Sequence, residues 1–391
     1  MIIFILFASI LLVAGNNIYL PFLPTISNYF DMHEFLIQLS ISIGSLIASV
    51  IGIFYGRWSD IHGRRKMMLF AMVLYILGSL GCALSYDTYS FLGSRLMQDL
   101  GSVGINILAI AIASDIYQGL IYSRFLGTYN SIFSLICVLT PILGAQLSKY
   151  YGWHSNFWFL LAIALILIVQ AFCYLPETLK KSKQSQNLSV LLKKIINMTK
   201  DSTFMLMTIG HIIPTCILLI FTVNIPFIFI DTYKFTPIQF SFYLSLLLLS
   251  NFLGNIAYRY KIQSNNLAEA LEIGYKSLLL YIVCASLIFM GITPDNPYII
   301  IAALCVAYFC TPYIITVCST KAYETQMRDK ALAVAVVSFW RNALMTITII
   351  LFSFSFDKKI YPVLKWTIVL SVLSFIISWI SAKDDKYFIK N

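Results

Sequence analysis

The stretch Gly56-Arg57-Trp58-Ser59-Asp60-Ile61-His62-Gly63-Arg64-Arg65-Lys66 decides the fold, because it sets a dense group of charges between two long apolar runs. The runs cover residues 35–56 and 67–86, and each has about the 20 residues that a helix needs to cross a membrane. Within the stretch, Gly63 permits a tight turn and Asp60 can pair with a neighbouring arginine. We therefore predict a short charged turn between two transmembrane helices; an ordinary basic loop is the alternative.

The composition extends this interpretation to the whole chain. The 391 residues are 59% hydrophobic and 11% charged, with a mean hydropathy of +0.83. A soluble domain carries about 25% charged residues, so this chain lacks the charge to cover a surface that faces water. The sequence predicts an all-α integral membrane protein with twelve transmembrane helices. The apolar windows lie near 2–26, 35–56, 67–86, 89–114, 125–148, 155–175, 204–230, 238–258, 274–291, 298–319, 331–354 and 361–382.

A polar stretch divides the windows into two sets of six. It covers 177–201 and follows the sixth window. We predict a six-helix bundle at 1–176, a cytoplasmic linker at 177–203 and a second six-helix bundle at 204–391, an organisation typical of transporters built from repeated halves. Residues 188–198 have the apolar spacing of a helix with lysines on one side. This spacing indicates a linker helix at the membrane surface, and a regulatory site is the alternative.

The basic residues predict the orientation of the chain. Most of the 27 Lys and Arg residues fall in alternate gaps between the windows. Basic loops remain in the cytoplasm, so we expect these gaps and both termini on the cytoplasmic side of the inner (plasma) membrane. The opposite gaps hold Lys149, Lys234, Lys358, Lys359 and Lys365.

Several function classes are disfavoured. The net charge of +10 lies in short gaps between apolar runs, a pattern that does not form a nucleic-acid-binding face. The eight cysteines have no metal-ligand spacing and the four histidines are scattered, so neither a metal nor a cofactor is expected. Catalytic signatures such as HExxH and the P-loop are missing from the sequence. We therefore expect no enzyme.

The charged turn resembles the cytoplasmic signature of the major facilitator superfamily, which Gly56, Asp60, Gly63, Arg64 and Arg65 all match. Other stretches are similar to the twelve-span drug:proton antiporters of that superfamily, especially the bicyclomycin- and chloramphenicol-resistance branch. The resemblance implies a two-bundle secondary transporter that works as a monomer and is gated on its cytoplasmic side by the charged turn. The similar stretches are Asn17-Ile18-Tyr19-Leu20-Pro21-Phe22-Leu23-Pro24, Arg95-Leu96-Met97-Gln98-Asp99-Leu100-Gly101, Leu175-Pro176-Glu177-Thr178-Leu179, and Pro226-Phe227 followed by Tyr233-Lys234-Phe235-Thr236-Pro237-Ile238-Gln239-Phe240.

Departures from the family pattern bear on the mechanism. Asn17 stands where the related antiporters usually have an aspartate, and an asparagine cannot take up a proton. Asp99 stands where they usually have a glycine, and Ile61 follows the turn's aspartate where an arginine is common. The fifth-window motif keeps Pro141, which can kink a helix, but it is otherwise degraded.

Ionisable residues inside the windows are the main candidates for function. Arg95, Asp99 and Arg341 lie well inside apolar windows, where a charge costs about 2.5–3.5 kcal/mol on insertion scales, so each should face a partner or a wet cavity. Arg95 and Asp99 are four residues apart on one helix face, which predicts either a structural ion pair or a proton-coupling site at Asp99. Arg341 is either a structural arginine or a contact for a substrate anion. The other candidates for substrate or cavity contacts are Asn17, Tyr19 and Gln98.

These observations predict a secondary transporter that moves a small molecule across the inner membrane. The first hypothesis is export of drugs or drug-like compounds coupled to protons. Two arginines against one aspartate leave a positive charge in the membrane, so the alternative is a carrier of an anionic metabolite, such as a carboxylate siderophore, in either direction. From a different class, a membrane receptor or sensor that does not transport is also open. The expected partners are the substrate, protons and the lipid bilayer.

Overall fold

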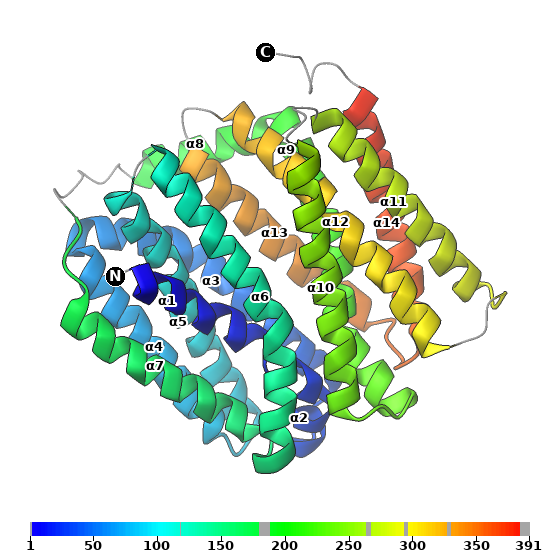
Figure 1. Cartoon of the computed structure of the whole chain (residues 1–391), viewed down its shortest axis with the longest axis horizontal. Helices are drawn as coiled ribbons and strands as arrows, with labels where there is room; N and C mark the ends of the chain where they lie inside the picture. The colour runs from blue at the N-terminus through cyan, green and yellow to red at the C-terminus, as the bar shows by residue number, and fades with distance from the viewer. Residues whose placement is uncertain are drawn as a thin grey trace. The chain divides into compact units, whose positions relative to one another are not determined.

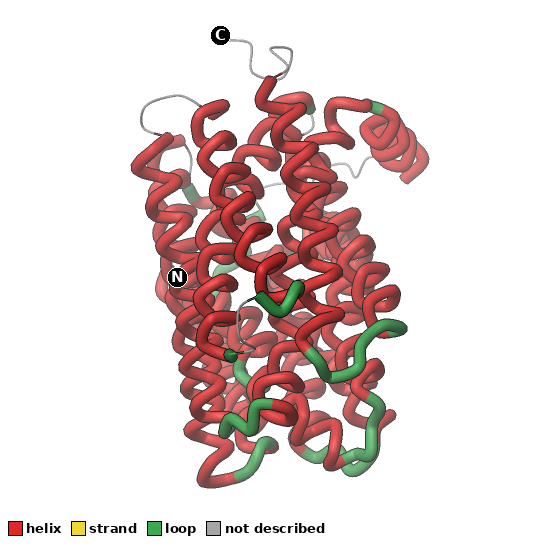
Figure 2. The backbone as a smooth tube through the Cα atoms, turned by 90° about the vertical axis from the view of Figure 1, so that its right-hand side faces the viewer, coloured by secondary structure: helices red, strands yellow, loops and turns green. Residues whose placement is uncertain are grey.

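The chain is all-α, as the sequence predicts. The structure is a computed structural model that describes residues 2–117, 119–179, 188–262, 267–292, 296–326 and 330–383, and the described part consists of helices and short connections without a strand (Figure 2). It divides into two compact units, Met1–Gln186 with Thr236–Phe242, and Asn187–Phe235 with Tyr243–Asn391. The boundaries at 176 and 203 that the polar linker suggests stay a prediction.

The helices of each unit follow one another along the chain (Figure 1). The first unit holds α1 (Ile2–Asn17), the 3₁₀ helix η1 (Leu20–Phe22), α2 (Leu23–Tyr29), α3 (Glu34–His62), α4 (Arg64–Ala83), α5 (Thr88–Ile116), α6 (Gly119–Tyr151) and α7 (His154–Tyr174). Most of the second unit is formed by α8 (Leu188–Lys200), α9 (Ser202–Phe227), the π-helix η2 (Ile228–Thr232), α10 (Pro237–Ile262), α11 (Leu267–Phe289), α12 (Pro297–Thr325), α13 (Lys330–Ser353) and α14 (Ile360–Lys383).

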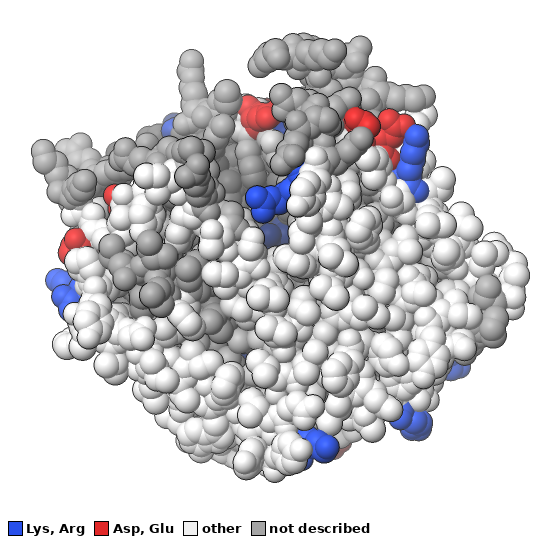
Figure 3. Space-filling view, in the orientation of Figure 1, with Lys and Arg blue, Asp and Glu red and all other residues white. Residues whose placement is uncertain are grey.

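Eleven helices in the described part are long and apolar enough to cross a membrane, and each coincides with one of the apolar windows from residue 35 onward. Their exposed faces carry large apolar side chains, which suit contact with lipid. On the face drawn in Figure 3, most of the described side chains are neither acidic nor basic. The chain is therefore a multi-pass membrane protein.

The first window is an interrupted helix. The helix α1 ends at Asn17 after 16 residues, and the chain continues through η1 into α2. Pro21 lies in the first turn of η1 and Pro24 in the first turn of α2. A proline has no N–H to donate and restricts the residue before it, so the helix ladder is interrupted here. The apolar window at 2–26 is continuous, so hydropathy alone does not predict this break.

Close packing of α4 against α5 holds the middle of the first unit together. A Cβ at Gly101 would lie 2.7 Å from the carbonyl oxygen of Ala71, and a Cβ at Gly78 would lie 2.7 Å from the Cα of Gln98. Both distances are shorter than a carbon side chain tolerates, so only glycine lets the two backbones approach this closely. Small residues at helix contacts are the usual means of bringing membrane helices together.

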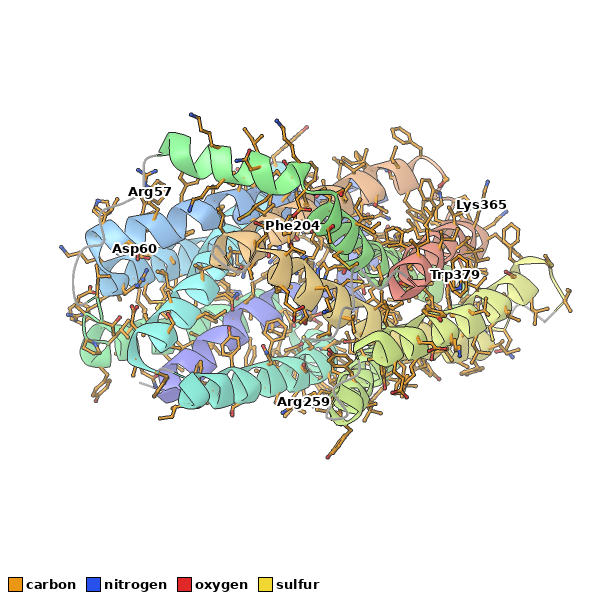
Figure 4. The ribbon with its side chains drawn as sticks, turned by 90° about the horizontal axis from the view of Figure 1, so that it is seen from above. Arg57, Asp60, Phe204, Arg259, Lys365 and Trp379 are labelled. Carbon is orange, nitrogen blue, oxygen red and sulfur yellow. The ribbon has the colours of Figure 1, made fainter. Side chains whose placement is uncertain are left out.

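The second unit has an apolar cluster at the end where α8 lies. Met198 of α8 packs with Phe204 and Met207 of α9, and residues of α12 and α13 complete the cluster. Figure 4 shows Phe204 near the start of α9. The predicted linker helix thus exists and contributes a buried methionine to this unit, while Lys193 and Lys200 are exposed.

Candidate functional site

Arg95 is the centre of a polar cluster inside the first unit. Its side chain extends from α5 and is 1% exposed. Its Nη2 lies 3.2 Å from Oδ1 of Asp99, and its Nη1 donates to the side-chain oxygen of Gln98. The Gln98 amide in turn donates to Ser79 Oγ on α4 at 2.8 Å. The residues that the sequence places on one helix face therefore form an ion pair within a hydrogen-bonded network.

The end of α1 supplies two further contacts to this cluster. The last carbonyls of a helix have no partner within it, and Arg95 Nη1 donates to the Gly15 carbonyl at 3.3 Å. Tyr19, beyond the end of α1, is fully buried and its hydroxyl accepts from Arg95 Nη2 at 3.3 Å. The guanidinium also lies 4.6 Å from the centre of the Tyr19 ring, within the range of a cation–π contact. The break in the first window thus positions Tyr19 and Gly15 against Arg95.

Asp99 keeps one oxygen without a partner. Its Oδ2 is buried and accepts no hydrogen bond from the described residues, and the Arg95 Nε atom is also without a partner there. The backbone of Gly44 on α3 lies against this carboxylate, and a Cβ at that position would overlap it. A buried carboxylate with a vacant oxygen can take up a proton and become neutral, which is the form that an apolar surrounding favours.

The charged turn between α3 and α4 forms a second network. Arg64, with 8% of its surface exposed, places Nη2 2.8 Å from Asp60 Oδ1 and Nε 3.0 Å from Asp115 Oδ2 at the end of α5. It also donates to the Ser59 hydroxyl. Figure 4 shows Asp60 near the end of α3. One guanidinium therefore connects the ends of three helices, as its fixed fork of donors allows.

Glu177, which follows α7, adds a further carboxylate contact to Arg64. Its two carboxylate oxygens accept from the backbone N–H of Arg64 at 2.9 Å and from that of Arg65 at 3.3 Å, at the start of α4. Partial burial acts to raise the pKa of the Glu177 carboxyl, but hydrogen bonds from backbone N–H groups, including those of Leu179 and Arg64, outweigh it and hold the pKa below its usual value. The carboxylate therefore caps α4 in its charged form, which a helix N-terminus favours.

The remaining predicted residues of the turn have different surroundings. Gly63 has a φ of +96°, and a Cβ there would overlap the Glu177 carboxylate. Arg65 Nη2 donates to the Phe172 carbonyl at 2.6 Å, and the guanidinium lies 5.8 Å from the Phe172 ring centre. Gly56, by contrast, has open space around its Cα. The geometry explains glycine at position 63 and gives no steric reason for it at 56.

Asn17 and Arg341 lie outside both networks. The Asn17 amide is half-buried and donates to the Val13 carbonyl of its own helix at 2.8 Å. Arg341 lies half-buried on α13 in the second unit, where it forms no ion pair with the described residues. The helix α13 contacts α9, which carries His211, and α12, which carries Tyr323. The structure thus brings together Arg95, Asp99, Gln98 and Tyr19, and it separates them from Asn17.

Three site residues escaped the sequence analysis: Asp115, Glu177 as a partner of the turn, and His211. Asp115 and Glu177 are separated from Arg64 by 51 and 113 residues, so spacing gives no sign of these contacts. The available signal was an acidic residue at the end of an apolar window beside a basic gap, where a carboxylate is expected to pair with a basic side chain. For His211, the available signal was a histidine inside an apolar window.

Comparison with known proteins identifies the family. A family model for the Major Facilitator Superfamily matches residues 5–347. The chain belongs to the Major Facilitator Superfamily. The Escherichia coli multidrug resistance protein MdtL is 29% identical over 173 residues, 44% of each chain. A chloramphenicol resistance protein of Pseudomonas aeruginosa is 29% identical over 165 residues, 42% of this chain and 39% of that one.

The solved structures agree on the fold of this superfamily member. The inward-open xylose transporter XylE of E. coli covers 97% of this chain and 94% of its own with a TM-score of 0.71, at 15% identity. The predicted superfamily fold is thereby confirmed. The match to the first curated relatives spans between 25% and 58% of their length.

Proposed function

We propose that this transporter exports drugs or drug-like small molecules across the plasma membrane in exchange for protons, with both termini in the cytoplasm. The relatives named for multidrug and chloramphenicol resistance support the class of cargo. The observation that carries the proton coupling is the Asp99 carboxylate, which is 4% exposed. One of its oxygens pairs with Arg95, and the other has no partner in the part of the chain that the structure describes. A charge at this depth is costly, so its protonation state affects which conformation is favoured.

Coupling follows from competition for the Asp99 carboxylate. When Asp99 is ionised it neutralises the guanidinium, and the pair is compatible with burial. When Asp99 takes up a proton, Arg95 keeps only the uncharged acceptors at Gln98, Tyr19 and Gly15. A drug that donates a hydrogen bond to the vacant Oδ2 of ionised Asp99 takes the position that a proton would take, so the drug and the proton compete for this carboxylate. This exclusion of one by the other is the requirement for antiport.

The charged turn is the proposed gate. Arg64 joins Asp60 of α3 to Asp115 of α5, and Glu177 caps α4 in the same place. Ion pairs at the ends of several helices form a network that is either complete or broken, because removing one partner leaves another charge unsatisfied. Such a two-state element is suited to opening and closing one side of a transport path.

Everted membrane vesicles test the proposal. Vesicles with and without the transporter receive an acid interior, and uptake of chloramphenicol and a panel of cationic, neutral and acidic drugs is followed. We expect uptake of at least one drug that stops when nigericin removes the pH gradient, together with drug-induced proton efflux. Uptake unaffected by the gradient would contradict proton coupling. Binding without counterflow of labelled drug would instead indicate a receptor.

A further inference from the structure

The second unit contains a partly buried polar group that the proposed proton site does not use. His211 lies on α9 and is 7% exposed, Ser319 and Tyr323 lie on α12, and Arg341 lies on α13. In the second unit α9 contacts both α12 and α13 (Figure 1). Arg341 is about 16 Å along α13 from its start at Lys330, near the middle of a hydrocarbon layer about 30 Å thick.

Neighbouring groups fix the hydrogen-bonding role of His211. Its Nδ1 lies 2.9 Å from Ser319 Oγ and 3.3 Å from the Ile315 carbonyl. The Ser319 hydroxyl donates its own proton to the Ile315 carbonyl, so both neighbours act as acceptors toward the ring. Nδ1 therefore carries the proton, and Nε2 of the neutral ring is an acceptor. This buried Nε2 has no partner among the described residues.

Arg341 supplies a positive charge that forms no ion pair with the described residues of this unit. Its Nε donates weakly to Asn342 at 3.4 Å, and α13 packs against both α9 and α12, which carry His211 and Tyr323. Four described carboxylates of this unit are engaged elsewhere. Asp201 caps α9, while Glu272, Glu324 and Asp231 pair with Lys276, Lys321 and Lys358. A half-buried arginine at this depth that pairs with none of the described carboxylates attracts a counter-ion from outside the chain.

The apolar cluster of the second unit adjoins this group. Tyr323 and Trp340, which precedes Arg341, pack against the buried cluster that includes Phe204 and Val337. The apolar side chains keep the local dielectric low and strengthen the attraction of Arg341 for an anion. The aromatic rings of Tyr323 and Trp340 also provide a surface for the apolar body of a ligand.

We propose that Arg341 and His211 form a cargo subsite that binds a carboxylate which also carries a hydroxyl or N–H donor. Arg341 holds the carboxylate through its planar fork, and Nε2 of His211 accepts from the second group. The subsite rests on the proposed transport function and names the class of cargo within it. A carboxylate matches the guanidinium in shape and charge, and the donor satisfies the vacant nitrogen.

Charge-selective labelling tests the electrostatic part without a known substrate. Ser338 is half-buried and lies one turn before Arg341 on the same face of α13, so Ser338→Cys places a thiol beside the guanidinium. The purified full-length protein is treated with an anionic sulfonatoethyl, a cationic trimethylammonium-ethyl or a neutral methyl methanethiosulfonate, and labelling at position 338 is read by mass spectrometry. The labelling rate with the neutral reagent corrects for how accessible the thiol at position 338 is in each variant.

We expect the anionic reagent to react faster than the cationic one, and Arg341→Gln to lower this ratio by at least about tenfold. Arg341→Lys, which keeps the charge, should preserve it. An equal ratio with and without Arg341, or no labelling by the anionic reagent, would overturn the subsite.

Protection by small acids tests the ligand class. Mandelate should protect the thiol best, phenylacetate, which lacks the hydroxyl, less well, and methyl mandelate, which lacks the charge, least. In His211→Phe, mandelate and phenylacetate should protect the thiol equally well. Phenylacetate should still protect it better than methyl mandelate does. Equal protection by acid and ester, or none up to their solubility limits, would overturn the assignment. These measurements use no gradient, so their failure is distinguishable from failure of proton-driven transport.

Discussion

The Asp99 carboxylate has two roles in the proposed mechanism: it neutralises Arg95, and it can take up a proton. Its Oδ1 pairs with Arg95, which makes burial of both charges tolerable. Its Oδ2 lies against Gly44 and has no hydrogen-bond partner among the residues described. A pair with all its hydrogen-bonding positions filled would be more stable and less able to respond to a proton. The vacancy is therefore consistent with a group whose protonation state changes during transport.

The two glycines of the charged turn should respond oppositely to alanine. Gly63→Ala forces a side chain into positive φ and against Glu177, and we expect a loss of about 1–3 kcal/mol of unfolding free energy. Gly56→Ala adds a methyl group to open space inside α3 and should stabilise the helix by up to about 1 kcal/mol. Thermal unfolding of the detergent-solubilised variants measures both. Equal destabilisation would show that the turn is not constrained as described.

The Glu177 contact should weaken at acid pH. Because the folded pKa is held below the unfolded value of about 4.3, the contact contributes fully above that pH and is lost as pH falls through the lower folded pKa. We expect hydrogen-exchange protection of the Arg64 and Arg65 amides to fall over this acidic range. Glu177→Gln should flatten the pH profile of this protection. Unchanged protection at pH 3 and pH 7 in the wild type would contradict the capping role.

At the scale of elements, the contact of α4 with α5 places Arg95 and Asp99. Gly101→Ala brings a Cβ to 2.7 Å from the Ala71 carbonyl, so the helices must separate, and we expect a loss of about 1–3 kcal/mol. Gly93→Ala is the matched control, because it lies on α5 with nothing within 4 Å of the added atom. Both are compared by thermal unfolding and by transport. A Gly101→Ala protein as stable as Gly93→Ala would contradict this close approach.

The elements themselves were largely predictable, and their contacts were not. A run of apolar residues long enough for the membrane is a local property, so eleven windows match helices, whereas Pro21 and Pro24 interrupt the first. The Arg95–Asp99 pair was predictable because four-residue spacing fixes one helix face. The partners Asp115 and Glu177 reach Arg64 from other segments, and nothing in one sequence reports such packing.

At the scale of the whole molecule, the loop charges make a prediction about topology. We expect Lys66, after α3, and Lys194, on α8, to lie on the cytoplasmic side, and Lys358, before α14, to lie on the opposite side. Single cysteines at these positions, labelled by a membrane-impermeant maleimide in intact cells and in everted vesicles, distinguish the two sides. Labelling of positions 66 and 194 from opposite sides would overturn the arrangement of the helices.

Proton coupling through Asp99 is the central claim, and the transport of one wild-type cargo by Asp99→Asn in proteoliposomes tests it most directly. Asparagine keeps the size and an acceptor for Arg95 but cannot titrate. We predict that counterflow of labelled cargo continues at a rate comparable to wild type, while accumulation driven by a pH gradient falls to the level seen without a gradient. Gradient-driven accumulation that survives in Asp99→Asn would contradict the claim.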